Sequence, residues 1–178
     1  MDFTKFSREH PEWVLRVSDN KQFLYQSLRI AHTGELRTVG QVDANDLEFN
    51  LDPACLQTSH TYDWNTWELH IVHHHIWGCP VLYFNISSKN GQLLSLDQVS
   101  ELIRCKNPID MPFRMIFGHE YHPILKNQVL FSIHPCATKE IMKEMAGEQF
   151  TDDRYIVLWL SLIQSAIGID LITLNRNL

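Results

Sequence analysis

Cys136 is the residue of this sequence best placed to carry out covalent chemistry. It follows the apolar segment 128–133, which is typical of a buried strand, and precedes Thr138 or Lys139, where we expect a helix to begin. A nucleophilic cysteine must be partly exposed, and a helix N-terminus or a nearby cation favours its thiolate form. His134 and Lys139 are close in sequence and could add positive charge. The pattern indicates a thiolate nucleophile, and the alternative is a small, inert apolar residue at a strand end.

The other cysteines, Cys55, Cys79 and Cys105, are widely spaced and form no Cys-x-x-Cys pair. The segment 1–10 is polar and charged and lacks the apolar core of a signal peptide. Cysteines used in this way favour reduced thiols over a disulfide framework. We therefore expect a cytoplasmic protein.

The composition is that of an ordinary folded protein and argues against several classes of function. The 178 residues are 44% hydrophobic and 20% charged, which suits one packed domain spanning 1–178. The formal net charge of −6 argues against nucleic acid as a partner. The apolar stretch 155–172 is interrupted by polar residues, so it falls short of the roughly 18 to 20 apolar residues of a membrane span. We expect a buried helix there, no integral membrane segment and no cofactor.

The elements that must position Cys136 form an α+β domain, in which an antiparallel β-meander sheet is covered by helices. The clearest signal is a hairpin around the break at Gly78-Cys79-Pro80, since both flanks are rich in β-branched and aromatic residues. Segment 31–59 is expected to be a loop with an embedded strand, and 107–118 mostly loop. The other predicted elements are a short helix within 2–14, strands over 23–31, 67–77, 81–87 and 128–133, and helices over 96–104, 138 or 139 to 146, and 152–167, capped at Ser95 and Thr151 and stopped at Gly168.

An ordered set of short motifs resembles one known family. The motifs are Tyr121-His-Pro-Ile-Leu125, Phe131-Ser-Ile-His-Pro-Cys136, Pro80-Val-Leu-Tyr-Phe84, the turn at Asn90-Gly91, the helix start at 93–99 and Trp159-Leu-Ser-Leu162. Together they resemble the ubiquitin-like-conjugating enzymes of autophagy, the family of autophagy-related protein ten. The resemblance covers roughly residues 67–168 and implies a fold like that of ubiquitin-conjugating enzymes.

The resemblance also implies a function. In this family a cysteine accepts the C-terminal glycine of a ubiquitin-like modifier, of the autophagy-related protein twelve type, from an activating enzyme. The modifier then passes to a lysine of a target protein, of the autophagy-related protein five type. By resemblance, Cys136 is that cysteine. A sister enzyme that modifies a lipid amine also has a His-Pro-Cys triplet, but this chain of 178 residues lacks its long acidic insertion, which favours the protein-targeting enzyme.

The sequence departs from ordinary ubiquitin-conjugating enzymes near the cysteine. Those enzymes carry a His-Pro-Asn motif whose Asn lies near the oxyanion, whereas this chain has His122-Pro123-Ile124, and Asn127 lacks the flanking motif. We hypothesise that His134 takes part of that role, orienting the thioester or assisting the amine. Alternatively, His134 hydrogen-bonds a backbone carbonyl and shapes the loop. Trp77 could pack near the site, although core packing is the simpler expectation.

The many histidines allow a zinc site as an alternative. On a strand, His73 and His75 would point to one face and His70 and His74 to the other. Two ligands from one strand, together with His119 and His122, would make the minimal site.

Two further interpretations concern Cys136 itself. A non-catalytic binding module on the same fold would hold the modifier or the target without covalent transfer. A cysteine hydrolase would pair Cys136 with a distant histidine and cleave a conjugate. In the enzyme interpretation, the hairpin 67–87 is a candidate for docking the target by strand addition at a sheet edge.

Overall fold

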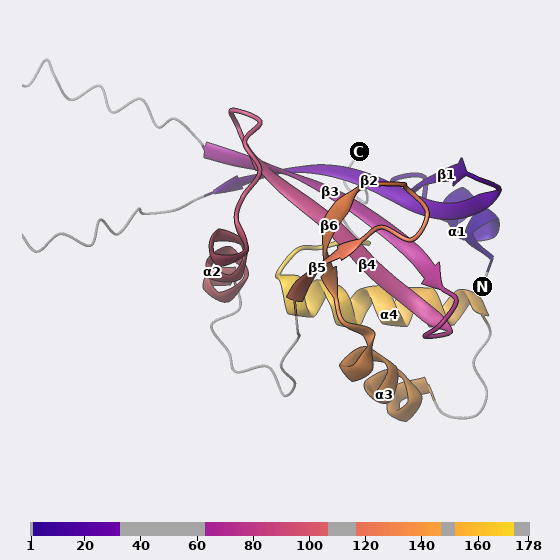
Figure 1. The fold of residues 1–178 in the computed structure, drawn as a ribbon. Coiled ribbons are helices and arrows are strands. Elements are labelled where there is room, and N and C mark those ends of the chain that lie inside the picture. The colour runs from indigo at the N-terminus through magenta and orange to yellow at the C-terminus, as the bar shows by residue number, and fades with distance from the viewer. Residues whose placement is uncertain (1, 33–62, 107–116, 147–151, 173–178) are drawn as a thin grey trace, which may run out of the picture.

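The computed structural model of the protein describes residues 2–32, 63–106, 117–146 and 152–172 (Figure 1). These residues form a six-stranded antiparallel sheet in the order β1-β2-β3-β4-β6-β5. The strands are β1 (Val14–Ser18), β2 (Lys21–His32), β3 (Asp63–His74), β4 (Cys79–Ser88), β5 (Phe117–Tyr121) and β6 (Val129–Ile133). The helices are α1 (Phe3–Glu9), α2 (Leu96–Lys106), α3 (Pro135–Ala146) and α4 (Asp152–Ile167). The predicted α+β fold, an antiparallel sheet with helices packed on it, is confirmed.

The main core lies between one face of the sheet and the helices. Alternate residues of β3 point into it, because side chains of a strand alternate between faces. α4 presents an apolar stripe at helical spacing to the same layer, and Figure 1 shows this helix lying across the sheet. The fully buried side chains that join the two layers include Trp67, Leu69 and Ile71 from β3 and Ile156, Trp159, Leu160 and Ile163 from α4.

One end of each of two helices, the start of α2 and the end of α4, is fixed by capping residues that can be recognised in the sequence. The amide of Ser95 donates to the side-chain oxygen of Gln98 at 2.9 Å, and the amide of Gln98 donates to Oγ of Ser95 at 3.3 Å. This reciprocal capping box confirms the predicted start of α2. Gly168 has φ +67° and donates its N–H to the carbonyl of Gln164, which confirms the predicted stop of α4.

A smaller apolar cluster covers part of the opposite face of the sheet. Its buried members come from β2, β3, β4, β6 and the loop that joins β5 to β6, and they are Phe23, Val72, Val81, Tyr83, Ile124 and Leu130. The loop 122–128 therefore folds back over the sheet and closes this second cluster. Both faces of the central strands are thus buried over part of their length.

Several predicted boundaries are wrong. Strand β3 spans Asp63–His74, and Cys79 belongs to β4 rather than to the turn, so the predicted strand 67–77 began and ended too late in the chain. The edge strands β1 and β5 were not predicted. Neither strand has a fully buried residue, and this weakens the period-two pattern of apolar residues. Helix α3 begins at Pro135 rather than at 138 or 139, since proline suits the first helical position.

The expected edge at hairpin 67–87 is also corrected. Strands β3 and β4 lie in the interior of the sheet, with β2 on one side and β6 on the other. The hairpin is therefore not an edge of the sheet, although β4 pairs with β6 only at Tyr83 and Phe84. Docking of a target on the hairpin stays a prediction. The described residues of segment 31–59 are only 31 and 32, at the end of β2, so the predicted loop there lies outside the described ranges, as does the predicted cap Thr151.

Candidate active site

Cys136 lies in the first turn of α3, immediately after a buried strand. Strand β6 is fixed because four of its five residues are buried and because Phe131 and Ser132 pair with β4. Pro135 opens the helix, so Cys136 is its second residue and is partly exposed. Helix N-termini present amides without partners inside the helix and the positive end of the macrodipole. The structure thus holds an accessible thiol at a helix N-terminus.

His134 caps this helix. Its Nδ1 accepts the backbone N–H of Cys136 at 3.2 Å, which is the interaction that an N-cap side chain makes with the second residue of a helix. A nitrogen that accepts this hydrogen bond carries no proton, so the ring is the neutral tautomer with its proton on Nε2. This hydrogen bond needs no positive charge on His134, so the expectation that His134 adds positive charge stays a prediction. Its backbone partner is an amide, not the carbonyl of the alternative hypothesis.

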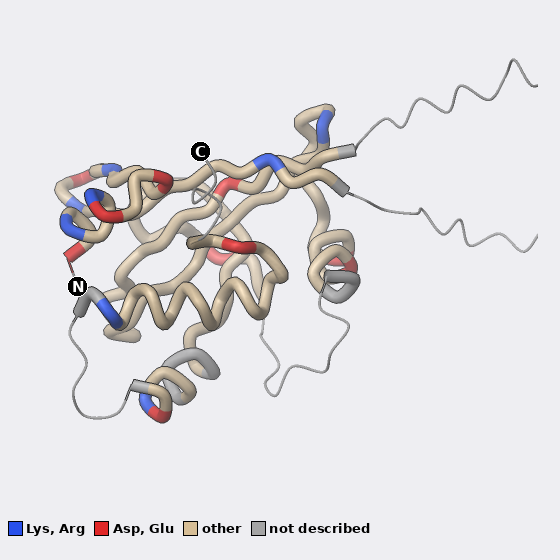
Figure 2. The backbone as a smooth tube through the Cα atoms, turned by 180° about the vertical axis from the view of Figure 1, so that it is seen from behind, with Lys and Arg blue, Asp and Glu red and all other residues tan. Residues whose placement is uncertain are grey.

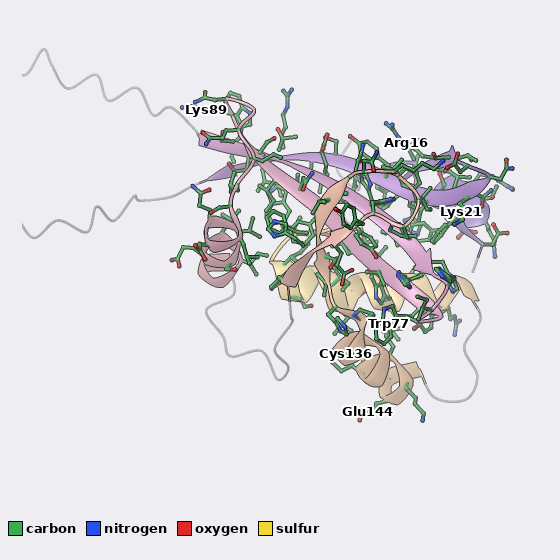
Figure 3. All side chains as sticks on the ribbon, viewed as in Figure 1. Arg16, Lys21, Trp77, Lys89, Cys136 and Glu144 are labelled. Atoms are coloured by element: carbon green, nitrogen blue, oxygen red, sulfur yellow. The ribbon has the colours of Figure 1, made fainter. Side chains whose placement is uncertain are left out.

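Trp77 packs against this imidazole. It stands in the turn between β3 and β4, and its ring centroid lies 5.1 Å from that of His134 at an interplanar angle of 72°, an edge-to-face geometry. Trp77 is 37% exposed, so the expectation of simple core packing is wrong. Figure 3 shows Trp77 and Cys136 at the same end of the sheet, beside the start of α3.

The His122-Pro123 motif lies at the opposite end of β6. His122 follows β5, and its amide donates to the carbonyl of Gln128 at the base of the loop. Asn127, in the same loop, is exposed and has φ +60°, a left-handed conformation that asparagine tolerates in turns. The length of β6 separates both residues from Cys136 by about 15 Å or more. Neither can take the place of the missing oxyanion asparagine.

His122 instead forms a buried pair with His70. Nδ1 of His122 accepts the amides of Ile124 and Leu125 at 3.2 and 2.9 Å, and its Nε2 lies 3.2 Å from Nδ1 of His70. Nδ1 of His122 is therefore unprotonated, and its Nε2–H donates to His70. The pKa of each ring is lowered to about 4, for His122 by burial and for His70 by burial first, then by the neighbouring His122 and then by Arg16. Both histidines are neutral at pH 7.

The zinc alternative finds no support in the described residues, where no group of three or more His, Cys, Asp or Glu side chains is placed to hold a metal. The ring of His119 contacts that of Phe131 in a tilted arrangement, with centroids 4.3 Å apart, away from the His70–His122 pair. The strand ends at His74, so His75 belongs to the turn, where its ring stacks on that of His74.

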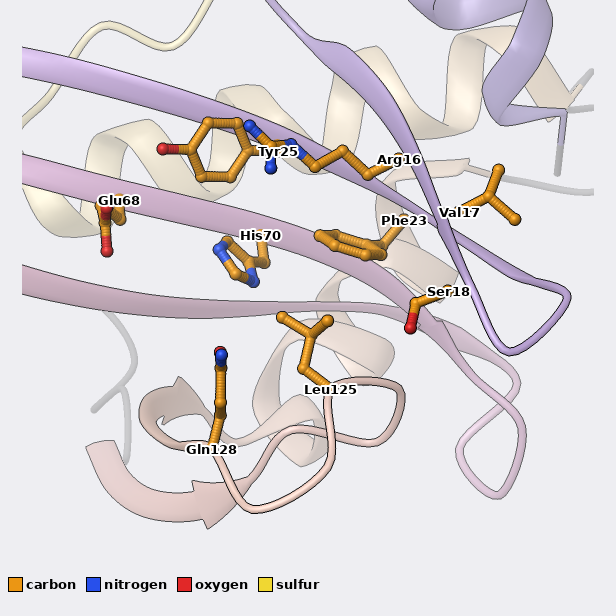
Figure 4. Close-up of a pocket in the computed structure, with 9 residues that line it drawn as sticks. All are labelled: Arg16, Val17, Ser18, Phe23, Tyr25, Glu68, His70, Leu125 and Gln128. Atoms are coloured by element: carbon orange, nitrogen blue, oxygen red, sulfur yellow. The ribbon is translucent and has the colours of Figure 1, made fainter.

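A polar cavity of about 370 Å³ opens on the face of the sheet opposite α4 (Figure 4). The guanidinium of Arg16 lies 4.0 Å from the ring centroid of Tyr25, and Glu68, His70 and Gln128 also line the cavity. Cys136 does not line it. This cavity is therefore separate from the candidate active site.

The charged residues of the described ranges do not mark one functional surface. Figure 2 shows basic and acidic residues intermixed around α1 and the β1–β2 turn, whereas α4 carries almost none along its length. None of the described helices is both long and apolar enough to cross a membrane.

A partly exposed cysteine at the His-Pro-Cys junction thus follows a buried strand in an α+β domain. The comparisons with known proteins show the family of this chain. The chain belongs to the family described as "Autophagocytosis associated protein, active-site domain", which it matches over residues 3–173. The resemblance to the autophagy conjugating enzymes is thereby confirmed.

Two curated relatives carry the name "Ubiquitin-like-conjugating enzyme ATG10". The one from Arabidopsis thaliana is 29% identical over 127 residues, which is 67% of this chain and 54% of the relative. The one from Homo sapiens is 32% identical over 111 residues, which is 59% of this chain and 50% of the relative. The chain thus spans about half the length of the curated relatives it matches. A solved structure described as "Crystal structure of Autophagic E2, Atg10" aligns with TM-score 0.48 and 16% identity, covering 93% of this chain and 87% of that one.

Proposed function

We propose that this chain is a single-domain, cytoplasmic conjugating enzyme of autophagy that carries a ubiquitin-like modifier as a thioester on Cys136. The observation that carries the proposal is a partly exposed cysteine in the first turn of α3, with its amide tied to His134. The family of the chain and the names of its relatives support the same class of reaction. By this proposal its partners are the activating enzyme, the modifier of the autophagy-related protein twelve type, and a target of the autophagy-related protein five type.

The reaction has two acyl-transfer steps. In the first, the thiolate of Cys136 attacks the carbonyl carbon of the modifier's C-terminal glycine, a C–S bond forms, and the bond to the activating enzyme breaks. In the second, the amine of a target lysine attacks that carbon, a C–N bond forms, the C–S bond breaks so that Cys136 leaves as a thiolate, and the nitrogen releases its proton to water. Each step develops negative charge on the carbonyl oxygen, where a fixed hydrogen-bond donor lowers the barrier.

We propose that His134 supplies such a donor through Nε2–H. The cap fixes Nδ1 as an acceptor, so the free side of the ring presents a proton and no lone pair. In this state the imidazole donates to the thioester oxygen and does not remove the proton from the lysine amine. The proposal therefore assigns His134 to stabilising the oxyanion rather than to general base catalysis.

A charging assay tests the carrier role. The purified chain, the activating enzyme, ATP and the modifier should give an adduct that reductant removes, and Cys136→Ser should give an adduct that reductant leaves intact. Cys79→Ser is the matched control, because Cys79 is buried at the start of β4 and should leave charging unchanged. Absence of an adduct with a demonstrably active activating enzyme would refute the carrier role and leave the non-covalent binding module.

Three substitutions separate the two tasks of His134. His134→Asn places an amide oxygen near the position of Nδ1 and keeps the cap, but it has nothing at the position of Nε2. His134→Gln places a donor near Nε2 but loses the cap, and His134→Ala loses both. We expect Asn and Ala to slow discharge of the thioester by about 100-fold, the effect of losing one oxyanion donor, with Gln retaining more activity. Equal discharge by the wild type and His134→Asn would refute the oxyanion role.

A further inference from the structure

The turn between β3 and β4 ends against the candidate active site. The amide of Gly78 donates to the carbonyl of His74 at 2.8 Å, and Gly78 adopts φ +62°, which together close the turn tightly. Strand β4 then pairs with β6, and β6 leads directly to His134. The sheet therefore fixes the turn and the His134 segment relative to each other.

Within this turn, Trp77 contacts His134 while its neighbour points elsewhere. Ile76 is 73% exposed, whereas Trp77 is 37% exposed and meets the imidazole edge to face. A tryptophan offers more contact area and a stronger ring quadrupole than other side chains, so it suits a contact that restricts a second ring. The size and the placement of Trp77 both point to His134 rather than to the core.

The imidazole needs a second restraint if its Nε2–H is to point in one direction. Its cap is a single hydrogen bond of 3.2 Å to Cys136, at the long end of the usual range, and a ring held at one atom can still swing about that bond. Contact with a second ring removes this freedom. Catalytic donors must be held within about 0.5 Å of the productive position by packing of this kind.

We propose that Trp77 is a positioning residue that holds the imidazole of His134 with Nε2–H directed at the thioester carbonyl. This inference rests on the proposed function, and it assigns Trp77 no contact with the modifier or with the target. Trp77 acts on the reaction through His134 alone. Its loss should therefore slow discharge only while His134 is present.

The experiment is a double-mutant cycle on discharge of the charged enzyme to a lysine acceptor, under single-turnover conditions. An aromatic pair of this geometry favours the bound orientation roughly two- to twelvefold, so Trp77→Ala should slow discharge by about that factor. Trp77→Phe should recover part of the rate, and the matched control Ile76→Ala should discharge at the wild-type rate. In the His134→Ala background, Trp77→Ala should change the rate no further. An equal loss in both backgrounds would overturn the inference and leave the carrier function in place.

A measurement without the partners separates this inference from the proposed function. Imidazole nitrogen shifts of His134 in ¹⁵N-histidine-labelled protein report which nitrogen carries the proton. The wild type and Ile76→Ala should show one tautomer with the proton on Nε2, and Trp77→Ala should move both shifts toward the average of exchanging tautomers. Unchanged shifts in Trp77→Ala would overturn the positioning role. Failure of the wild type to charge would instead refute the proposed function.

Discussion

The buried His70–His122 pair predicts a loss of stability in mild acid. Each ring already has its acceptor nitrogen occupied, since His122 accepts two backbone amides and His70 faces the Nε2–H of His122. A second proton on either ring would point at an existing donor and would place a charge in a buried site. This geometry agrees with the lowered pKa of about 4 for both side chains, against an ordinary value of 6.5.

The direction and the size of this loss of stability follow from proton linkage. Between pH 6.5 and pH 4 the unfolded chain binds protons that the folded chain does not, so stability is complete above pH 6.5 and falls as the pH drops toward 4. Each such proton lowers the free energy of unfolding by at most about 1.4 kcal/mol per pH unit. Because His70 borders an open cavity that lets water relax the penalty, we expect on the order of 2 kcal/mol from the pair between pH 6 and pH 4.5.

Urea unfolding of the wild type and of His122→Asn across this pH range measures how much the His70–His122 pair contributes to the pH dependence of the free energy of unfolding. The asparagine oxygen can still accept the loop amides, but it takes up no proton, so the pH profile of the variant should be flatter by about half of the pair's contribution. His73→Asn is the control, since His73 is exposed and should leave the profile unchanged. Parallel profiles for the wild type and His122→Asn, or a ring titration of His122 near pH 6.5 by NMR, would contradict the reasoning.

Two further substitutions test the local rules that build the frame of the site. Ser95→Ala removes one half of the capping box at α2 and should lower the free energy of unfolding by about 1 kcal/mol, with Gln98→Ala adding little to it in a denaturation cycle. Gly78→Ala should cost about 1 kcal/mol because of its φ of +62°, although its Cβ would meet open space, whereas Gly78→Asn should cost less. Equal free energies of unfolding for Gly78→Ala and the wild type would contradict the strained turn conformation at Gly78.

The sequence predicted the elements that bury a strong periodic pattern and missed those that do not. The central hairpin, α2, β6 and α4 combine an apolar stripe with a cap or a turn residue, so local chemistry and burial point to the same structure. The edge strands β1 and β5 contribute few buried side chains, so their sequences carry little periodicity. The end of β3 was predicted too late because His75 to Trp77 have the composition of a strand although they form the turn that Gly78 closes.

The candidate site was predicted in its residues but not in its contacts. Cys136 and His134 stand out by type and spacing, and the structure places them in one helix cap. A signal was present for the true helix start, since proline at the first helical position after a potential cap is a known pattern. The contacts of Trp77 with His134 and of His70 with His122 join residues more than 50 positions apart, and one sequence offers no rule that pairs them.

The same geometry explains how this site can dispense with a His-Pro-Asn loop. In this chain the His122-Pro123 loop has a structural task at the far end of β6, where His122 accepts two amides and its ring contacts Phe23 and Tyr83 of the smaller apolar cluster. The polar donor of the proposed reaction has instead moved to His134, two positions before the cysteine. One side chain then both starts α3 and directs a proton outward, so the helix that presents Cys136 also sets the orientation of the donor. It follows that substitutions which shift the start of α3 should impair both steps by displacing Cys136 and the donor together, whereas His134→Asn, which keeps the cap, should slow both steps through loss of the donor alone.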